Sequence, residues 1–129
     1  MTYPAWFLAM PAKRLDTISQ RFEIGVPLLA AIIQVESGGN PYATRFEPRW
    51  KYFFKVSEMA HEVGSTAHTE ENGQSTSWGL MQVMGTVARE HGFRGWFPEL
   101  CEMECGLYYG AKHLKVKMIK HVNLPASIS

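Results

Sequence analysis

The sequence has little net charge, and this bounds the kinds of partner it can have. Its 129 residues carry 13 Lys and Arg against 12 Asp and Glu, a formal charge of +1. It has neither the strongly basic composition typical of nucleic-acid binding nor an acidic tail, so no nucleic-acid partner is expected. A chain of this length that is 46% hydrophobic can bury a core of its own. We therefore expect residues 1–129 to form a single domain.

Cysteine is scarce, and the usual metal motifs are absent from the sequence. Cys101 and Cys105, four positions apart, would share one face of a helix, where the directions of the Cβ atoms make a disulfide awkward. We expect two reduced, packed thiols, because two thiols alone do not complete a metal site. The five histidines show no HExxH spacing and no CxxC pair. The sequence thus predicts neither a metal nor another cofactor.

No apolar run in the sequence is long enough to span a membrane. The first residues, MTYPAWFLAMPAKR, lack the basic start of a signal peptide, and Pro4 and Pro11 interrupt their apolar stretch. We therefore expect a protein that is made in the cytoplasm and that needs another route to act outside it.

Helical periodicity is the main structural signal in the sequence. Residues 11–23 suit an amphipathic helix that begins at Pro11. Residues 27–37 suit a second helix that is apolar on nearly every face, which predicts burial all round. Further helices are expected over residues 50–63, 78–84, 85–93 and 99–120. Strand signal is weak, and the polar residues 64–77 favour a surface loop or a small irregular β-hairpin. The expected fold class is mostly α.

An acid at the end of the second predicted helix is the first candidate catalytic group. In AAIIQVESGG, residues 30–39, Glu36 lies in the last turn, and Gly38 is a natural C-cap. The partial negative charge of a helix C-terminus and burial beside apolar residues would both disfavour a charged carboxylate there. A carboxyl that keeps its proton near neutral pH is what a general acid needs. On this segment alone, a solvated surface glutamate is the simpler interpretation.

A second segment makes the interpretation specific. In STSWGLMQVMG, residues 75–85, a compact apolar turn carries a single amide, Gln82. ESGGNPYA followed by SWGLMQVMG, with Gly79 placed 43 positions after Glu36, resembles the lytic transglycosylases of glycoside hydrolase family 23. RFEPRW and FPELCEMECGLYYGAKHL make the sequence most similar to the short phage-type members. The resemblance covers about residues 28 to 114.

The resemblance implies a lysozyme-like fold, peptidoglycan glycan strands as the partner, and no cofactor. It implies cleavage of the bond between N-acetylmuramic acid and N-acetylglucosamine, with formation of a 1,6-anhydro ring. Glu36 would be the sole essential acid and base, acting on the cell wall after release or delivery of the protein. The candidate substrate-binding residues are Ser37, Tyr42, Gly79, Leu80, Met81 and Gln82. For Tyr42, as for Trp78, Tyr108 and Tyr109, packing in the core is at least as good an interpretation.

A second carboxylate would favour a different reaction. Ordinary glycosidases use two acids, whose spacing sets the stereochemical outcome. Glu70, in the polar stretch before TSWGLMQ, is the best candidate, although a solvated loop charge explains it as well. Glu47, between Arg45 and Arg49, could equally form an ion pair. A lysozyme-type hydrolase and a glycan-binding chain without catalysis therefore stay open as alternatives.

The end of the sequence departs from the family pattern. After HLK the pattern should reach an AYN-like motif, whereas this chain continues as VKMIKHVNLPASIS. Asn123 lacks the preceding Ala-Tyr, and Pro125 should end a helix soon afterwards. We expect the closing helices of the domain to be missing, which would leave an apolar surface that favours homo-oligomers and would reduce activity.

Overall fold

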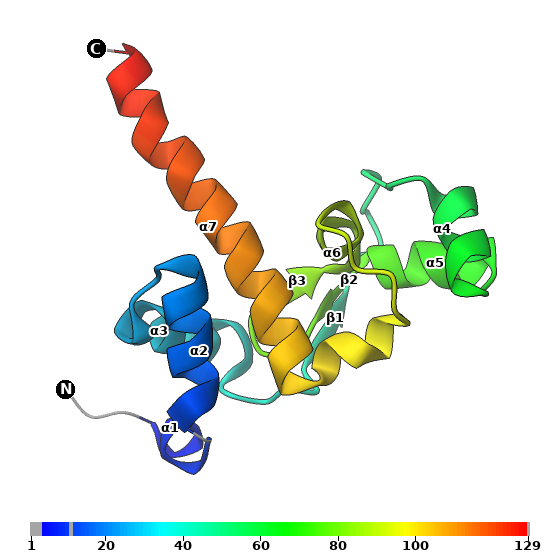
Figure 1. The fold of residues 1–129 in the computed structure, drawn as a ribbon. Coiled ribbons are helices and arrows are strands. Elements are labelled where there is room, and N and C mark those ends of the chain that lie inside the picture. The colour runs from blue at the N-terminus through cyan, green and yellow to red at the C-terminus, as the bar shows by residue number, and fades with distance from the viewer. Residues whose placement is uncertain (1–3, 11, 129) are drawn as a thin grey trace.

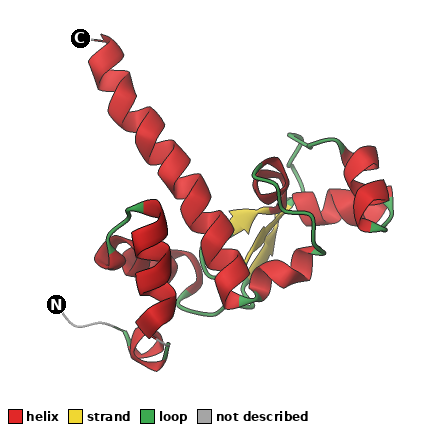
Figure 2. Cartoon of the chain, viewed as in Figure 1, coloured by secondary structure: helices red, strands yellow, loops and turns green. Residues whose placement is uncertain are grey.

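The computed structural model describes residues 4–10 and 12–128, and it is built mainly of helices around a small sheet (Figures 1 and 2). The α-helices are α1 (Ala5–Ala9), α2 (Ala12–Phe22), α3 (Val26–Ser37), α4 (Val56–Val63), α5 (Ala67–Gln74), α6 (Gly85–Glu90) and α7 (Met103–Ile128). The strands are β1 (Thr44–Phe46), β2 (Thr76–Trp78) and β3 (Val83–Met84), and a 3-10 helix, η1, covers Phe97–Cys101. The mostly α, lysozyme-like fold class predicted from the sequence is confirmed.

The long helix α7 divides the molecule. Figure 1 shows α1, α2 and α3 on one side of α7, and the sheet with α4, α5 and α6 on the other. The C-terminal half of α7 extends beyond the other elements (Figure 2). It runs through Pro125, where the sequence predicted a helix to end. Pro11, the expected first residue of α2, lies outside the described residues.

The sheet differs from the sequence prediction in its position. The three strands pair antiparallel in the order β1-β2-β3, with Thr44 opposite Trp78 and Trp78 opposite Val83. Residues 64–77, predicted as a loop or hairpin, contain α5 and only the first two residues of β2, Thr76 and Ser77. Residues 78–84, predicted as a helical piece, form the end of β2, the β2–β3 turn and β3. Short strands paired at long range leave little periodicity in the sequence, which is why the weak strand signal misplaced them.

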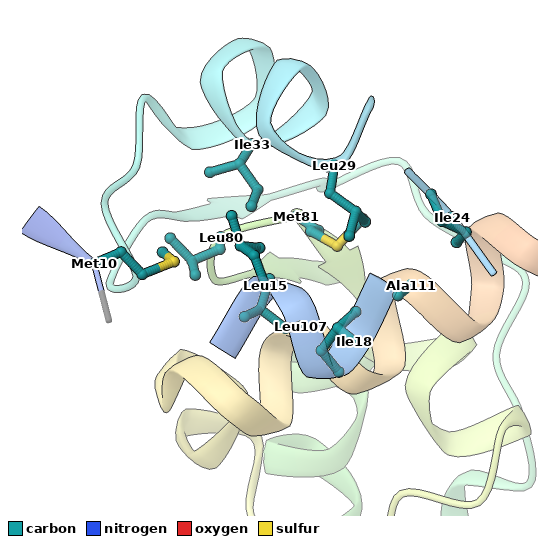
Figure 3. Close-up of a cluster of buried hydrophobic side chains, with 10 residues drawn as sticks. All are labelled: Met10, Leu15, Ile18, Ile24, Leu29, Ile33, Leu80, Met81, Leu107 and Ala111. Atoms are coloured by element: carbon teal, nitrogen blue, oxygen red, sulfur yellow. The ribbon is translucent and has the colours of Figure 1, made fainter. Parts of the chain in front are cut away.

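The larger core lies where α2, α3 and α7 meet the β2–β3 turn (Figure 3). Its members are Met10, Leu15, Ile18, Ile24, Leu29, Ile33, Leu80, Met81, Leu107 and Ala111. Gly110 of α7 makes room for the turn, because a Cβ at this position would lie 2.6 Å from the Cβ of Met81. This close approach anchors the turn that carries Gln82 to the face of α7.

Helix α3 is not buried all round, so that prediction is wrong. Leu29, Ala30 and Ile33 are buried, but Val35 is 81% exposed and Leu28 44% exposed. The core covers only one side of α3, and no described element covers the other. The composition of a helix reports how apolar it is, whereas its neighbours decide which faces are covered.

The polar segment before β2 is held by a buried ion pair. Helix α5 begins at the N-cap Thr66, whose Oγ1 accepts a hydrogen bond from the Thr69 backbone N–H at 3.2 Å. Glu70, 1% exposed, accepts hydrogen bonds from Arg89 Nε at 2.8 Å and Arg89 Nη2 at 3.0 Å. Gln74 Nε2 donates a third at 2.8 Å. Paired polar groups thus replace apolar ones here, which hides the helix from a search for hydrophobic periodicity.

Helix α4 begins later than predicted. Residues 50–55 are irregular, and the helix starts at Val56 after Lys55, which adopts φ 43°. Phe54 explains the delay, because its backbone N–H and C=O are both bonded to the side chain of Gln74.

Among the described residues, no single helix combines the length and the hydrophobicity of a membrane span.

Candidate functional site

A groove of about 460 Å³ brings the two sequence motifs together. It lies between the C-terminal end of α3, the β2–β3 turn and α7. Its lining residues are Ile32, Glu36, Trp50, Met81, Gln82, Val83, Met84, Val87, Gly110, His113, Leu114 and Lys117. Glu36 and Gln82, far apart in the chain, thus face one cavity of the size expected for a small-ligand site.

Glu36 lies in the last turn of α3 and is exposed. The prediction that apolar neighbours bury this carboxyl is therefore wrong, because the face of α3 that carries it is uncovered. Gly38 ends the helix at φ 61°, and its N–H bonds to the Gln34 carbonyl at 3.2 Å. No described group donates a hydrogen bond to the Glu36 carboxylate or pairs with it. The carboxylate is free to meet a ligand in the groove.

Gln82 is held in a fixed orientation at the turn between β2 and β3. Its backbone adopts φ 52°, an uncommon conformation for a residue with a side chain. Its Nε2 donates to the Ala43 carbonyl at 2.8 Å and to the Gly79 carbonyl at 2.9 Å. Among the described residues none donates to its Oε1, so this oxygen is available as an acceptor. The amide is anchored through nitrogen and presents oxygen.

Three other candidate binding residues form the turn that carries Gln82 and pack it against the rest of the protein. Leu80 is 1% exposed in the core, while Met81 both packs in that core and lines the groove. Gly79 adopts φ 76°, and a Cβ there would lie 2.5 Å from the Leu100 carbonyl oxygen. Only glycine fits this turn without moving the backbone of η1. A direct contact of Gly79 or Leu80 with substrate stays a prediction.

Ser37 and Tyr42 do not line the groove. Ser37 Oγ donates to the Ile33 carbonyl at 3.1 Å and accepts from the Gly39 N–H at 3.2 Å, so it completes the end of α3. Tyr42 is 76% exposed, and its backbone N–H bonds to Asn40 Oδ1 at 3.0 Å. Their role in substrate binding stays a prediction that depends on how far a glycan extends past the groove.

Glu70, the candidate second carboxylate, faces a different cavity. It lines a hollow of about 550 Å³ between α4, α5 and η1, together with Trp78, Trp96 and Phe97. Both of its oxygens are occupied by Arg89, with Gln74 as a further donor. A carboxylate so engaged has a structural function, and it does not share the Glu36 groove.

Several groove residues were not singled out from the sequence. Trp50 lies within RFEPRW, and its Nε1 donates to Thr86 Oγ1 at 3.0 Å. His113 and Lys117 come from α7, one helical turn apart. The i, i+4 spacing could have placed the latter two on one face, but only the packing of α7 shows that this face meets the groove.

A pair of histidines joins α6 to α7 beside the groove. His91 Nε2 and His113 Nδ1 lie 3.1 Å apart. Partial burial lowers the pKa of His113 to about 4, with further contributions from the charges of Lys117, His91 and Lys120. Burial and Lys112 also lower the pKa of His91, against the opposing effect of Glu90. The fold therefore favours the neutral form of both rings.

This pair predicts a loss of stability in mild acid. The folded protein keeps His113 neutral down to about pH 4, whereas the unfolded chain protonates it near its ordinary value of 6.5. The unfolded state thus binds more protons in this window, and stability falls as the pH falls through it. Thermal unfolding across the window should show a melting temperature that declines by a few degrees, and His113→Gln should decline less. An equal decline in both proteins would contradict the assignment.

The two cysteines, Cys101 and Cys105, are free and half-buried. Burial, with the charges of Glu102 and Glu99, raises the pKa of the Cys105 thiol to about 11, so it is a poor nucleophile at neutral pH. Within the part of the chain that the structure describes, no three His, Cys, Asp or Glu side chains come close enough to hold a metal ion.

Comparison with known proteins identifies the family. Curated proteins give no match, and solved structures give none. A family model, that of the transglycosylase SLT domain, matches residues 15–123. This match contains Glu36, the β2–β3 turn and the α7 residues of the groove. Because it covers most of the sequence, the chain belongs to the transglycosylase SLT domain family, which cleaves the glycan strands of peptidoglycan.

Proposed function

We propose that this protein is a peptidoglycan lytic transglycosylase that cleaves the bond between N-acetylmuramic acid and N-acetylglucosamine, with Glu36 as its acid and base. The observation that carries the proposal is the groove shared by Glu36 and Gln82, since these residues belong to the two motifs that resemble the family. We also propose that the protein acts on the cell wall after release or delivery from the cytoplasm.

The proposed reaction needs one protein carboxyl. Protonated Glu36 gives its proton to the glycosidic oxygen, the bond from that oxygen to C1 of the muramic acid breaks, and the N-acetylglucosamine leaves as an alcohol. The substrate's own N-acetyl group stabilises the positive charge at C1. The Glu36 carboxylate then takes the proton from the C6 hydroxyl as its oxygen bonds to C1, which closes the 1,6-anhydro ring. No water is consumed, and Glu36 ends protonated as it began.

The surroundings of Glu36 support both proton transfers. The carboxylate has no competing partner among the described residues, and it ends a helix whose C-terminal partial charge is negative. A sugar that fills the groove would also displace water from the carboxyl, which strengthens its hydrogen bonds to the glycosidic oxygen and to the C6 hydroxyl. Gln82 Oε1 could accept a hydrogen bond from the N–H of an N-acetyl group or from a sugar hydroxyl.

The hydrolytic alternative would need a second carboxylate to activate water. Glu70 was the best candidate in the sequence, but Arg89 and Gln74 occupy its oxygens, and it does not line the groove. This arrangement favours a reaction with a single acid and base.

The products of peptidoglycan digestion test the proposal. A transglycosylase leaves 1,6-anhydro ends, which lack one water relative to the reducing ends left by a hydrolase. We expect mass spectrometry of muropeptides released by the purified protein to show anhydro ends. Reducing ends alone would establish the hydrolase, and no release above that of a Glu36→Gln sample would favour a glycan-binding chain without catalysis.

A further inference from the structure

The chain between β1 and α4 is irregular in structure, yet it is firmly anchored. We refer to residues 47–55 as the strap; it passes α6 on its way to α4 (Figure 1). The Glu47 N–H donates to the Ser75 carbonyl at 2.8 Å. Farther along, the Phe54 N–H donates to Gln74 Oε1 at 2.7 Å, and Gln74 Nε2 donates to the Phe54 carbonyl at 2.8 Å. The two ends of the strap are therefore fixed to α5 and to the residue that follows it.

The middle of the strap is fixed as well. Trp50 Nε1 bonds to Thr86 Oγ1, and that hydroxyl donates to the Gln74 carbonyl at 3.0 Å. Thr86 and Gln74 are fully buried, and Gln74 also contacts the Glu70 carboxylate. A satisfied buried network of this kind gives the strap one conformation. The indole of Trp50 is thus held in place as a wall of the Glu36 groove.

The outer face of the strap continues from the groove to the surface. Tyr52 is 66% exposed, and its ring meets that of Trp50 edge to face at 5.5 Å. Lys51 Nζ lies 5.9 Å from the centre of the Tyr52 ring. Trp50, Lys51 and Tyr52 therefore form one contiguous cluster, the strap cluster, with one end in the groove and the other in solvent.

The strap also carries an excess of positive charge. Arg49, Lys51 and Lys55 are exposed, and within the described chain no carboxylate pairs with them. The one acid of the strap, Glu47, is already bound by Arg45 Nε at 3.0 Å. The strap thus has three cations available for an anionic ligand that approaches from solvent.

We propose that the strap cluster is a second glycan subsite, outside the groove, for a strand that carries peptide stems. A sugar ring next to those in the groove would lie on the exposed ring of Tyr52, as apolar sugar faces do on aromatic rings. The carboxylates of a peptide stem would pair with the Lys51 ammonium group, and the positive charges of Arg49 and Lys55 would add to the electrostatic attraction. This inference rests on the proposed function, because the strand reaches the strap from the groove of Glu36.

The aromatic and basic character of the strap would also suit an anionic membrane surface. The geometry favours the glycan. The strap cluster is continuous with the groove, and the rings of Trp50 and Tyr52 lie edge to face. Tyr52 exposes the flat face of its ring, which suits a sugar better than it suits insertion between lipid chains.

The subsite is tested by measuring how much protein sediments with purified, insoluble peptidoglycan. All variants carry Glu36→Gln as well, so that the glycan is not cleaved during the measurement. Tyr52→Ala should weaken binding about fivefold, the loss of one aromatic contact. Lys51→Gln should weaken it at low salt and make it less sensitive to added salt. Trp96→Ala is the matched control, since Trp96 is 64% exposed but lines the other cavity. It should bind as the parent does.

Further ligands separate the possible outcomes. With peptidoglycan stripped of its peptide stems, Lys51→Gln should no longer weaken binding, whereas Tyr52→Ala should weaken it as before. Equal binding by Tyr52→Ala, Lys51→Gln and Trp96→Ala would overturn the proposal. A second result would also overturn it: the parent binds phosphatidylglycerol vesicles, and Tyr52→Ala and Lys51→Gln abolish that binding but leave binding to the glycan unchanged. This assay measures binding and needs no catalysis. It therefore tests the strap subsite even if the digestion experiment finds no anhydro product.

Discussion

Replacement of Glu36 by glutamine is expected to lower the release of anhydro-muropeptides by about 10² to 10⁴-fold. This is the range typical of a general acid or base, and here one carboxyl performs both steps. Glutamine keeps the size of the side chain and its place in the last turn of α3, but it can neither give the proton to the glycosidic oxygen nor take one from the C6 hydroxyl. The measurement is the initial rate of product formation from purified peptidoglycan, followed by mass spectrometry.

The Glu36 experiment has a matched control within the chain. Glu58 is an exposed glutamate on α4 that does not line the groove, so Glu58→Gln makes the same chemical change elsewhere. It should retain the parental rate. The melting temperature of Glu36→Gln should also stay close to that of the parent, because the carboxylate has no partner among the described residues to lose. A Glu36→Gln protein that keeps full activity would exclude Glu36 as the acid.

Replacement of Glu70 by glutamine is expected to destabilise the fold by about 3–5 kcal/mol. It leaves the Arg89 guanidinium without its counter-charge in a site where both side chains are 1% exposed. Removing one partner of a buried ion pair has this effect because the remaining charge is neither solvated nor paired. Equilibrium unfolding in urea measures it, as a lower midpoint with an unchanged slope.

The ion pair of Arg45 and Glu47 provides the control for this measurement. Its atoms are 3.0 Å apart, but the two side chains are 76% and 38% exposed. Glu47→Gln should change stability by less than about 1 kcal/mol, since solvent already screens that pair. The same experiment separates a structural from a catalytic function of Glu70. A stable Glu70→Gln protein that has lost turnover would restore Glu70 as a second catalytic carboxylate.

The groove that contains Glu36 is open to solvent on the side of the carboxyl. In the described chain the groove walls come from α3, the β2–β3 turn, Trp50 of the strap and α7. No described element covers the carboxyl. Reduced activity and homo-oligomers stay predictions from the sequence, and the rate measured for the parent protein bears on the first.

Local patterns in the sequence were enough to predict α2, α3, α6, α7 and the two motifs. The helical spacing of Leu15 and Ile18 correctly predicted the buried face of α2, and Leu107 and Ala111 did so for α7. Glu36 and Gln82 stood out because ESGGNPYA followed by SWGLMQVMG resembles the lytic transglycosylases, and the match to the transglycosylase SLT domain agrees with that resemblance. These features can be predicted from the sequence because each depends on residues close together in the chain or on a motif of fixed spacing.

Tertiary structure decided everything that depends on contacts between distant segments. The burial of Glu70 follows from Arg89, which lies 19 positions away, and no periodicity in α5 announces it. The exposure of Glu36 follows from the lack of a cover over one face of α3, which the helix's own composition could not reveal. Trp50 and His113 joined the site because the strap and α7 pack against the same groove. The sequence by itself determined where α2, α3, α6 and α7 form and which motifs are present. The packing of distant elements determined where α5 and the strands form, which charges are buried or free, and what surrounds Glu36.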